Sequence, residues 1–297
     1  MDINSSTLRA VFTALSTAYN MRFNAVQPMY STVAMVVPST SAMNEYPRLD
    51  DVQGFREWIG DRVIQDLGAQ TYIVRNKPYE KTIGILRTQI EDDQIGIFTP
   101  VAAQMGQDAA QFPDQLVWPL FKTGETVKCY DGQYFFDTDH PGYNEAGQPI
   151  SVSNFTDGAG PAWYLVDDTQ VMKPLIFQDR KKFQLVSLTS PDDPNVFYQN
   201  KFVWGVDGRC AAAYGLWQLA YKSKATLNEA NFEAARTAMS TIRRRDGSPL
   251  NIQGVKLIVP PALEGAAKRI VGAENLANGA SNVWKNAATV VSVPYLA

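Results

Sequence analysis

The sequence contains few of the residues from which catalytic and metal sites are built. Histidine occurs once and cysteine twice among 297 residues. Cys129 and Cys210 stand far apart in the chain and outside any metal-ligand spacing, and so few cysteines argue against a disulfide framework and fit a reducing compartment. We therefore interpret both cysteines as small buried apolar side chains.

A large excess of charge of one sign is also missing, and so are long apolar runs. The chain has 27 basic and 30 acidic residues, so it lacks the positive field that holds a nucleic-acid backbone, and we expect no tight sequence-independent binding of DNA. No window reaches the roughly 18 apolar residues that span a bilayer, and the first 20 residues contain no apolar signal-peptide core. We expect neither membrane insertion nor secretion by that route.

Phosphate-binding and nucleophile motifs are absent as well. No Walker sequence and no Gly-x-Ser-x-Gly elbow occurs, and the acidic run "EDDQ" lacks the glycine and the spacing of a calcium loop. The sequence therefore predicts no cofactor and no metal ion.

The stretch "FFDTDHPG" holds the single histidine, His140, between Asp137 and Asp139 on one side and a Pro-Gly pair on the other. One hypothesis is a hydrolase that uses Asp137, Asp139 and His140 for acid-base chemistry. A metal site would need three or four converging ligands, and no second histidine exists to supply one. Since Asp, Pro and Gly are typical of a tight loop, we favour a structural turn.

The apolar residues that are present, 45% of the chain, are ample for a core. Their pattern predicts an amphipathic helix over residues 1–22 and then a Ser/Thr/Pro-rich extended arm. Strands are expected at 71–75 and 81–90, joined by a turn over "NKPYE" at 76–80. Such a polar hairpin cannot build a core of its own, so we expect it to project and to find its partner on another surface.

A long helix is expected to begin at Thr99-Pro100. It has roughly 22 residues and a length of about 33 Å. Pro113 inside it predicts a kink or a break. Its apolar stripe comprises Val101, Met105, Ala109, Phe112, Leu116 and Leu120.

The second half of the chain predicts strands and helices without a regular βαβ alternation, which indicates an α+β fold. Strands are expected at 162–166, 171–177, 183–188 and 255–259, with a final one near the C-terminus. One helix is expected at 210–221, and another from the capping box Thr226/Glu229 to Gly247. The positive charges of the arginines at 243–245 would then interact favourably with the negative, C-terminal end of the helix dipole. A helix ending at Gly272 follows a Pro-Pro start.

Several of these stretches, in order, resemble one family. They are "REWIGDRVIQDL", "NKPYEKTIGILR", "IEDDQIGIFTPVAAQMG", "CYDGQYFFDTDHP", "KPLIFQDRKKFQLV", "AYGLWQLA" and the final "VPYL". The sequence is similar to the major head subunits of Mu-like phages and prophages over nearly its whole length. The resemblance implies a major capsid protein with the Hong Kong 97-type fold. The remaining alternative is another virion structural protein, of the tail or baseplate.

The resemblance also implies a division of the chain. Residues 1–44 would form an N-terminal helix and N-arm, 45–92 the extended E-loop region, and 93–150 a peripheral domain with a long spine helix. Residues 151–225 would be divided between peripheral and axial domains, and 226–297 would be mainly axial.

Assembly partners follow from the same resemblance. The chain would associate with itself as hexamers and pentamers, and with a portal, a scaffold and a maturation protease during assembly in the host cytoplasm. The virion could also carry a cement or decoration protein. The packaged double-stranded DNA would be bound only weakly by this near-neutral chain. We expect no enzymatic activity and no lysine-asparagine cross-link through Lys77 or Lys81. The residues expected to contact neighbouring subunits are Trp58, Arg62, Tyr72, Arg75, Lys77, Tyr79, Lys81, Ile83 and Ile85.

Overall fold

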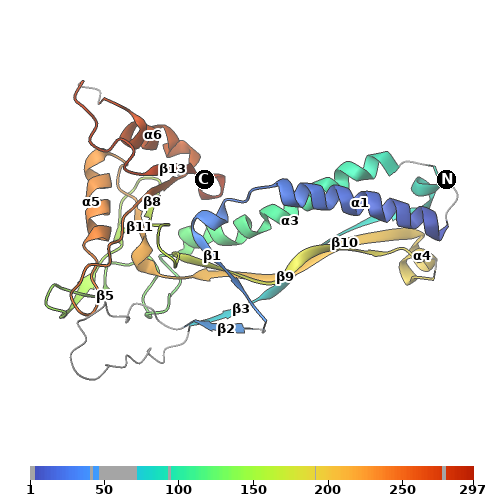
Figure 1. Ribbon diagram of the computed structural model, residues 1–297, viewed down its shortest axis with the longest axis horizontal. Helices are drawn as coiled ribbons and strands as arrows, with labels where there is room; N and C mark the ends of the chain where they lie inside the picture. Colours follow the sequence, from blue (N-terminus) through green and yellow to red (C-terminus); the bar gives the residue numbers. More distant parts are fainter. Residues whose placement is uncertain (1–3, 41–42, 47–71, 93–94, 191, 276–278) are drawn as a thin grey trace.

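The computed structural model describes residues 4–40, 43–46, 72–92, 95–190, 192–275 and 279–297. Trp58 and Arg62 lie outside these residues. Figure 1 shows an elongated molecule with two long helices and a sheet along its length and a second, wider body at the end near the C-terminus. No helix in the described part of the chain is long and apolar enough to cross a membrane.

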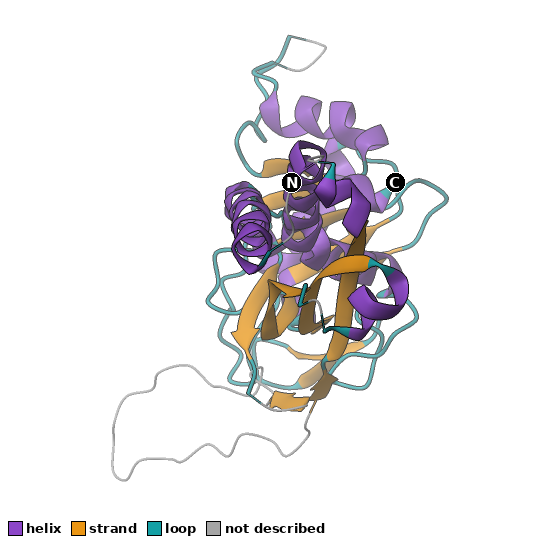
Figure 2. Ribbon diagram, turned by 90° about the vertical axis from the view of Figure 1, so that its right-hand side faces the viewer, coloured by secondary structure: helices purple, strands orange, loops and turns teal. Residues whose placement is uncertain are grey.

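The elongated body consists of two helices on one face of a four-stranded sheet (Figures 1 and 2). The helices are α1 (Ser5–Ala25) and α3 (Ile95–Thr123), and the strand order is β1 (Ala34–Pro38), β9 (Leu175–Leu188), β10 (Lys201–Tyr214) and β4 (Lys77–Leu86). The two helices approach closely at Gly106, where any Cβ atom would collide with the carbonyl oxygen of Tyr19. Leu8, Val11 and Leu15 of α1 pack with Ile85 and Trp204 of the sheet.

The second body is a five-stranded sheet with helices α5 (Glu229–Ser240) and α6 (Glu264–Gly272). Its strand order is β13 (Thr289–Ser292), β12 (Lys256–Val259), β8 (Trp163–Val166), β11 (Ala220–Ser223) and β7 (Phe155–Thr156). Trp118 and Phe121, near the end of α3, belong to the same buried cluster as β8 and α5. One apolar core therefore joins the two bodies.

Short elements complete the fold. Two separate ribbons are made by β2 (Met43–Tyr46) with β3 (Tyr72–Arg75) and by β5 (His140–Tyr143) with β6 (Pro149–Val152). The short helices are α2 (Arg87–Glu91), α4 (Pro194–Gln199) and the 3-10 turns Tyr30–Thr32, Trp217–Leu219, Pro261–Leu263 and Pro294–Leu296.

The expected hairpin with a turn at 76–80 is wrong. β3 pairs antiparallel with β2, whereas β4 begins at Lys77 and pairs with β10 over ten residues. Pro78 is tolerated because β4 is the edge strand of its sheet, so its missing N–H faces no further strand. Residues 72–86 thus form two successive strands that pair with different partners.

The spine helix is longer than expected and is not broken. α3 continues through Pro100, Pro113 and Pro119 as one helix of 29 residues. Of the expected stripe, Met105 and Ala109 are buried, Val101 is exposed, and Phe112, Leu116 and Leu120 are half-buried. The buried face also includes Ala102, Ala110 and Val117, each one position after a residue of that stripe. α3 packs against α1 at Gly106 and against the sheet through Met105, and this packing favours a continuous helix through the buried Pro113.

Two expectations for the second half are also wrong. Residues 210–214 end strand β10 and do not begin a helix, because Ala211, Ala212 and Ala213 pair with β9 and this tertiary pairing overrides the helix preference of the alanines. Helix α5 is capped by Asn228, whose side chain accepts from the Asn231 N–H, and it ends at Ser240. Arg243 therefore lies beyond the helix and pairs with Glu145.

Candidate functional site

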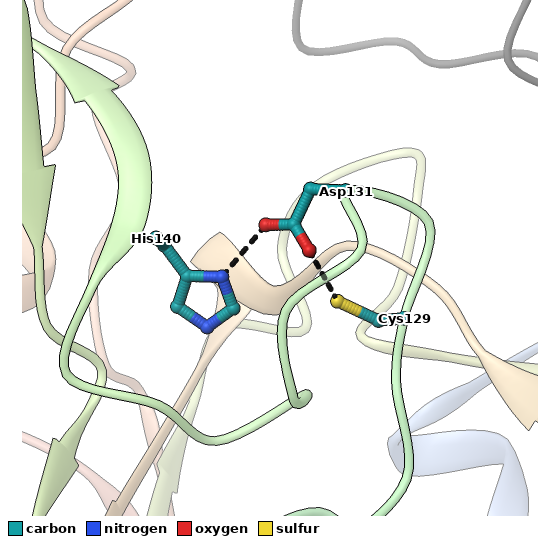
Figure 3. Close-up of side chains that lie close together, drawn as sticks. All are labelled: Cys129, Asp131 and His140. Carbon is teal, nitrogen blue, oxygen red and sulfur yellow. Dashed lines mark hydrogen bonds and ion pairs between the residues drawn. The ribbon is translucent and has the colours of Figure 1, made fainter.

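His140 lies in a buried cluster with two residues from the preceding loop (Figure 3). Its Nδ1 is 2.7 Å from Oδ2 of Asp131, and both side chains are fully buried. The thiol of Cys129 donates to Oδ1 of Asp131 at 3.0 Å, and so does the Gln133 backbone N–H. The imidazole stacks on Trp217 with ring centroids 4.0 Å apart. We call Cys129, Asp131 and His140 the His140 cluster.

The order of groups in this cluster does not suit nucleophilic catalysis. Asp131 stands between the thiol and the imidazole (Figure 3), so both donate to the carboxylate and the imidazole takes no proton from the sulfur. Burial and the neighbouring Asp131 raise the pKa of the Cys129 thiol far above its usual range. Burial by itself would raise the pKa of Asp131, but hydrogen bonds from His140 and Cys129 lower it. The cluster holds a carboxylate and an unreactive thiol.

The hydrolase hypothesis placed the wrong carboxylates beside His140. The carboxylate of Asp137 accepts from the backbone N–H groups of Tyr134 and Thr138, as a turn residue does. The backbone carbonyl of Asp139 accepts a hydrogen bond from the Gln133 side chain. Asp131 could have been suspected only from the Asp-Gly turn nine residues before the histidine.

The His140 cluster also has the donor atoms of a transition-metal site. One ligand atom from each residue lies within 4.8 Å of the others. Zinc in proteins is usually held by four ligands at about 2.0 to 2.3 Å. Here the two carboxylate oxygens accept hydrogen bonds from the thiol and the imidazole, whereas the buried Nε2 of His140 has no hydrogen-bond partner among the described residues.

The second candidate site is the set of residues expected to contact other subunits. Three of them pack within the chain, which corrects the expectation that they lack an intrachain partner. Ile85 is buried, Ile83 packs against the same cluster, and the Tyr79 ring lies 4.6 Å from that of Phe112. From Tyr79 to Ile85, β4 therefore presents its odd-numbered side chains to the helices.

The charged members of the set are placed differently. Lys81 is paired with Asp108 of α3, on the same face as Ile83. Arg75 and Lys77 are exposed at the junction of β3 and β4, and Tyr72 opens β3 opposite Tyr46. Subunit contact by Arg75 and Lys77 stays a prediction.

Comparison with known proteins agrees with this architecture over the full chain. Residues 8–296 match the family model of the Mu-like prophage major head subunit gpT. The major capsid protein of Escherichia phage Mu is 36% identical, with 100% of both chains covered. The Mu-like prophage FluMu major head subunit of Haemophilus influenzae is also 36% identical, over 92% of this chain and 91% of that protein.

Solved structures agree as well. A chain from the procapsid of bacteriophage JBD30 superposes with a TM-score of 0.88 at 41% identity, covering 99% of this chain and all of that chain. A chain from the JBD30 capsid gives a TM-score of 0.79 at 34% identity, with 92% of both chains covered. The fold is thus that of Hong Kong 97-type phage capsid proteins, and the chain belongs to the family of Mu-like major head subunits.

Proposed function

We propose that copies of this chain associate as hexamers and pentamers into the closed icosahedral shell of a Mu-like phage head. The observation that carries the proposal is the likeness to the JBD30 procapsid chain over 99% of the residues. An elongated subunit whose sheet has an exposed face also suits a wall in which each chain is covered by its neighbours.

The domains of the proposed subunit follow from the two bodies. We assign α1, α3 and the four-stranded sheet to the peripheral domain, with α3 as its spine, and the five-stranded sheet with α5 and α6 to the axial domain. This assignment moves α1 from the expected N-arm and β4 from the expected E-loop region into the peripheral domain, and it places β9 and β10 on the peripheral side of the divided region 151–225.

We place the root of the E-loop at the β2–β3 ribbon. This ribbon is hydrogen-bonded to neither large sheet, and a two-stranded ribbon by itself is marginally stable in water. It is anchored by Val74, which packs with Ile176 and Ala211. Exposed Ile73 lies beside that anchor and would be covered by a neighbouring subunit.

Further partners are proposed from the relatives. JBD30 forms a procapsid, and its capsid is decorated with minor capsid protein trimers. By analogy we propose that this chain assembles in the host cytoplasm with a scaffold, a portal and a maturation protease, and that its shell accepts a decoration protein. We propose no catalytic role, because the His140 cluster holds its thiol protonated.

Electron microscopy of the protein produced together with the scaffold and protease of its phage tests the function. The unmodified chain should give closed shells of uniform size. A variant with residues 45–72 replaced by a short Gly-Ser linker should remain folded by circular dichroism and form no shells. The linker must spare β4, whose ladder with β10 is part of the fold.

The two parts of this experiment test different claims. Absence of particles from the unmodified chain would contradict the shell function. Normal shells from the linker variant would leave the function intact and would show that the ribbon is not the contact that joins subunits.

A further inference from the structure

The C-terminal end of α3 lies where the elongated body meets the second body (Figure 1). There the backbone carbonyl of Phe121 accepts hydrogen bonds from the Tyr164 hydroxyl and from the Lys222 ammonium, each at 3.2 Å. All three residues are buried. The last four carbonyls of a helix have no partner within the helix, so side chains of the five-stranded sheet satisfy one of them here.

The two donors are placed by the pairing of the sheet. Tyr164 of β8 and Lys222 of β11 stand directly opposite each other in the antiparallel pair that these strands form. Side chains at such positions lie on the same face and close together. Both strands are interior strands of the sheet, so the donors are held on a firm support.

Glu125, two residues beyond the helix, adds an ionic part to this contact. Its Oε1 bonds Lys222 at 2.5 Å and its Oε2 bonds Lys224 at 2.6 Å. We call Phe121, Glu125, Tyr164, Lys222 and Lys224 the spine joint. Positive charge at the C-terminal end of a helix also interacts favourably with the helix dipole. Each bond of the joint connects the end of α3 with the five-stranded sheet or the residue after β11.

The apolar core that the two bodies share does not by itself fix the angle between them. The hydrophobic effect is non-directional, so apolar surface is buried favourably in many orientations. A buried ion pair is not needed for stability either, because apolar residues of similar volume often replace it without loss. Hydrogen bonds, in contrast, require particular distances and angles. What the spine joint adds to the core is therefore a defined orientation.

We propose that the spine joint fixes the angle between the elongated body and the five-stranded sheet, and that this angle determines the diameter of the shell. The inference rests on the proposed function. In a closed assembly of identical chains every subunit repeats the same angle, so a small change in the angle is repeated around the shell and alters its curvature. None of the five residues was among those expected from the sequence to take part in assembly.

Electron microscopy of shells made from a neutral joint tests the proposal. The joint variant combines Tyr164→Phe, Glu125→Gln and Lys222→Met. Its melting temperature should stay within a few degrees of that of the unmodified chain, because the paired charges are removed together. We expect it to form open sheets and closed particles of several diameters, where the unmodified chain forms shells of one diameter.

Tyr19→Phe is the matched control. Tyr19 is as deeply buried as Tyr164, and its hydroxyl donates to the Phe183 carbonyl within the elongated body. The control loses the same kind of hydrogen bond away from the joint, so its shells should keep one diameter. Shells of uniform, normal diameter from the joint variant would overturn the proposal while the shell function stands. Uneven shells from Tyr19→Phe would overturn it as well, since any lost hydrogen bond would then have the same effect.

The angle itself is measured in the free subunit by electron paramagnetic resonance. Spin labels are attached at Phe197→Cys on α4 and Val283→Cys in the second body, where both native side chains are exposed. Cys129 and Cys210 are buried and escape labelling. The distance distribution between the labels should be narrow with the native joint and broader in the joint variant and in Tyr164→Phe alone.

An unchanged distance distribution in Tyr164→Phe would overturn the proposal, even should the joint variant misfold. Absence of shells from the unmodified chain would instead contradict the proposed function.

Discussion

Single buried polar residues in this subunit are held by specific partners, and those partners come from distant positions. Asn154 is an example: its side chain donates to the carbonyls of Phe135, Trp217 and Ala220, and so ties the loop after α3 to β11. The His140 cluster does the same for the loop before β5. Buried groups of this kind cost free energy when a partner is removed, which makes them testable by substitution.

His140→Leu should destabilise the subunit more than His140→Asn does. Both lose the stack on Trp217, but the asparagine amide can still donate to Asp131 from the place of Nδ1. Leucine leaves the carboxylate short of a donor, at a cost of about 1 to 3 kcal/mol relative to asparagine. Urea unfolding of both variants measures the difference.

Equal stability of the two would show that the imidazole acts only through packing. Stoichiometric zinc in the purified protein that disappears from the His140→Leu variant would contradict the structural role of the His140 cluster.

Lys222 of β11 is a second buried polar residue, and it contacts the end of α3. Its ammonium is almost completely buried, bonds Oε1 of Glu125 and donates to the Phe121 carbonyl, while Lys224 bonds the other oxygen. Burial would raise the pKa of Glu125, but hydrogen bonds from Lys222 and Lys224 lower it below its ordinary value. Burial also lowers the pKa of Lys222.

Glu125→Gln should therefore destabilise the subunit at neutral pH, by about 3 kcal/mol, because it leaves the Lys222 charge buried without its partner. Adding Lys222→Met should recover most of the loss. The folded pKa of Glu125 lies below the unfolded one, so its contribution is complete above about pH 4.3 and is lost as pH falls through the folded value.

Thermal unfolding between pH 3 and 7 checks both statements. The wild-type protein should lose stability on acidification more steeply than Glu125→Gln. A double variant no more stable than Glu125→Gln alone would contradict the role given to the buried ammonium.

Secondary-structure elements show where local preference and tertiary packing disagree. α3 contains three prolines, which local preference would exclude from a helix interior, yet it spans the whole peripheral body. One face of its C-terminal half is buried, with Val117, Trp118 and Phe121 fully inside the common core. That burial is what stabilises the helix.

Phe121→Ala should lower the free energy of unfolding by about 3 to 5 kcal/mol, whereas Phe112→Ala should cost roughly half as much. Phe121 is fully buried and stacks on Trp118, while Phe112 is half-buried between Tyr79 and Phe183. Chemical unfolding of the two variants gives the ratio. Equal losses would mean that the helix face has been placed one residue off.

At the scale of the whole molecule, well-packed regions and exposed apolar regions lie in different places. The five-stranded sheet and the common core are built from fully buried side chains such as Trp163 and Leu257. The end of the elongated body at α4 instead leaves apolar side chains such as Phe197 and Tyr198 exposed. The free subunit can thus be folded and still have surfaces whose apolar area is buried only by assembly.

The sequence by itself determined the α+β class, helices α1 and α6, strands β8 and β12, and the family. Those elements have a clear apolar period or distinct end signals, such as the Pro-Pro start and Gly272 end around α6. The ordered motifs from "REWIG" to "VPYL" identified the family because several of them agree at once.

Tertiary structure alone decided which strands pair and which side chains contact one another. Residues 77–86 can pair with any strand, and only the presence of β10 made them an edge strand and not half of a hairpin. The alanines of β10 prefer a helix locally, but pairing with β9 satisfies their backbone groups within the sheet. Asp131, not Asp137 or Asp139, reached His140 because the loop folds back on itself. Pairing and burial are contacts between distant residues, and no local pattern contains them.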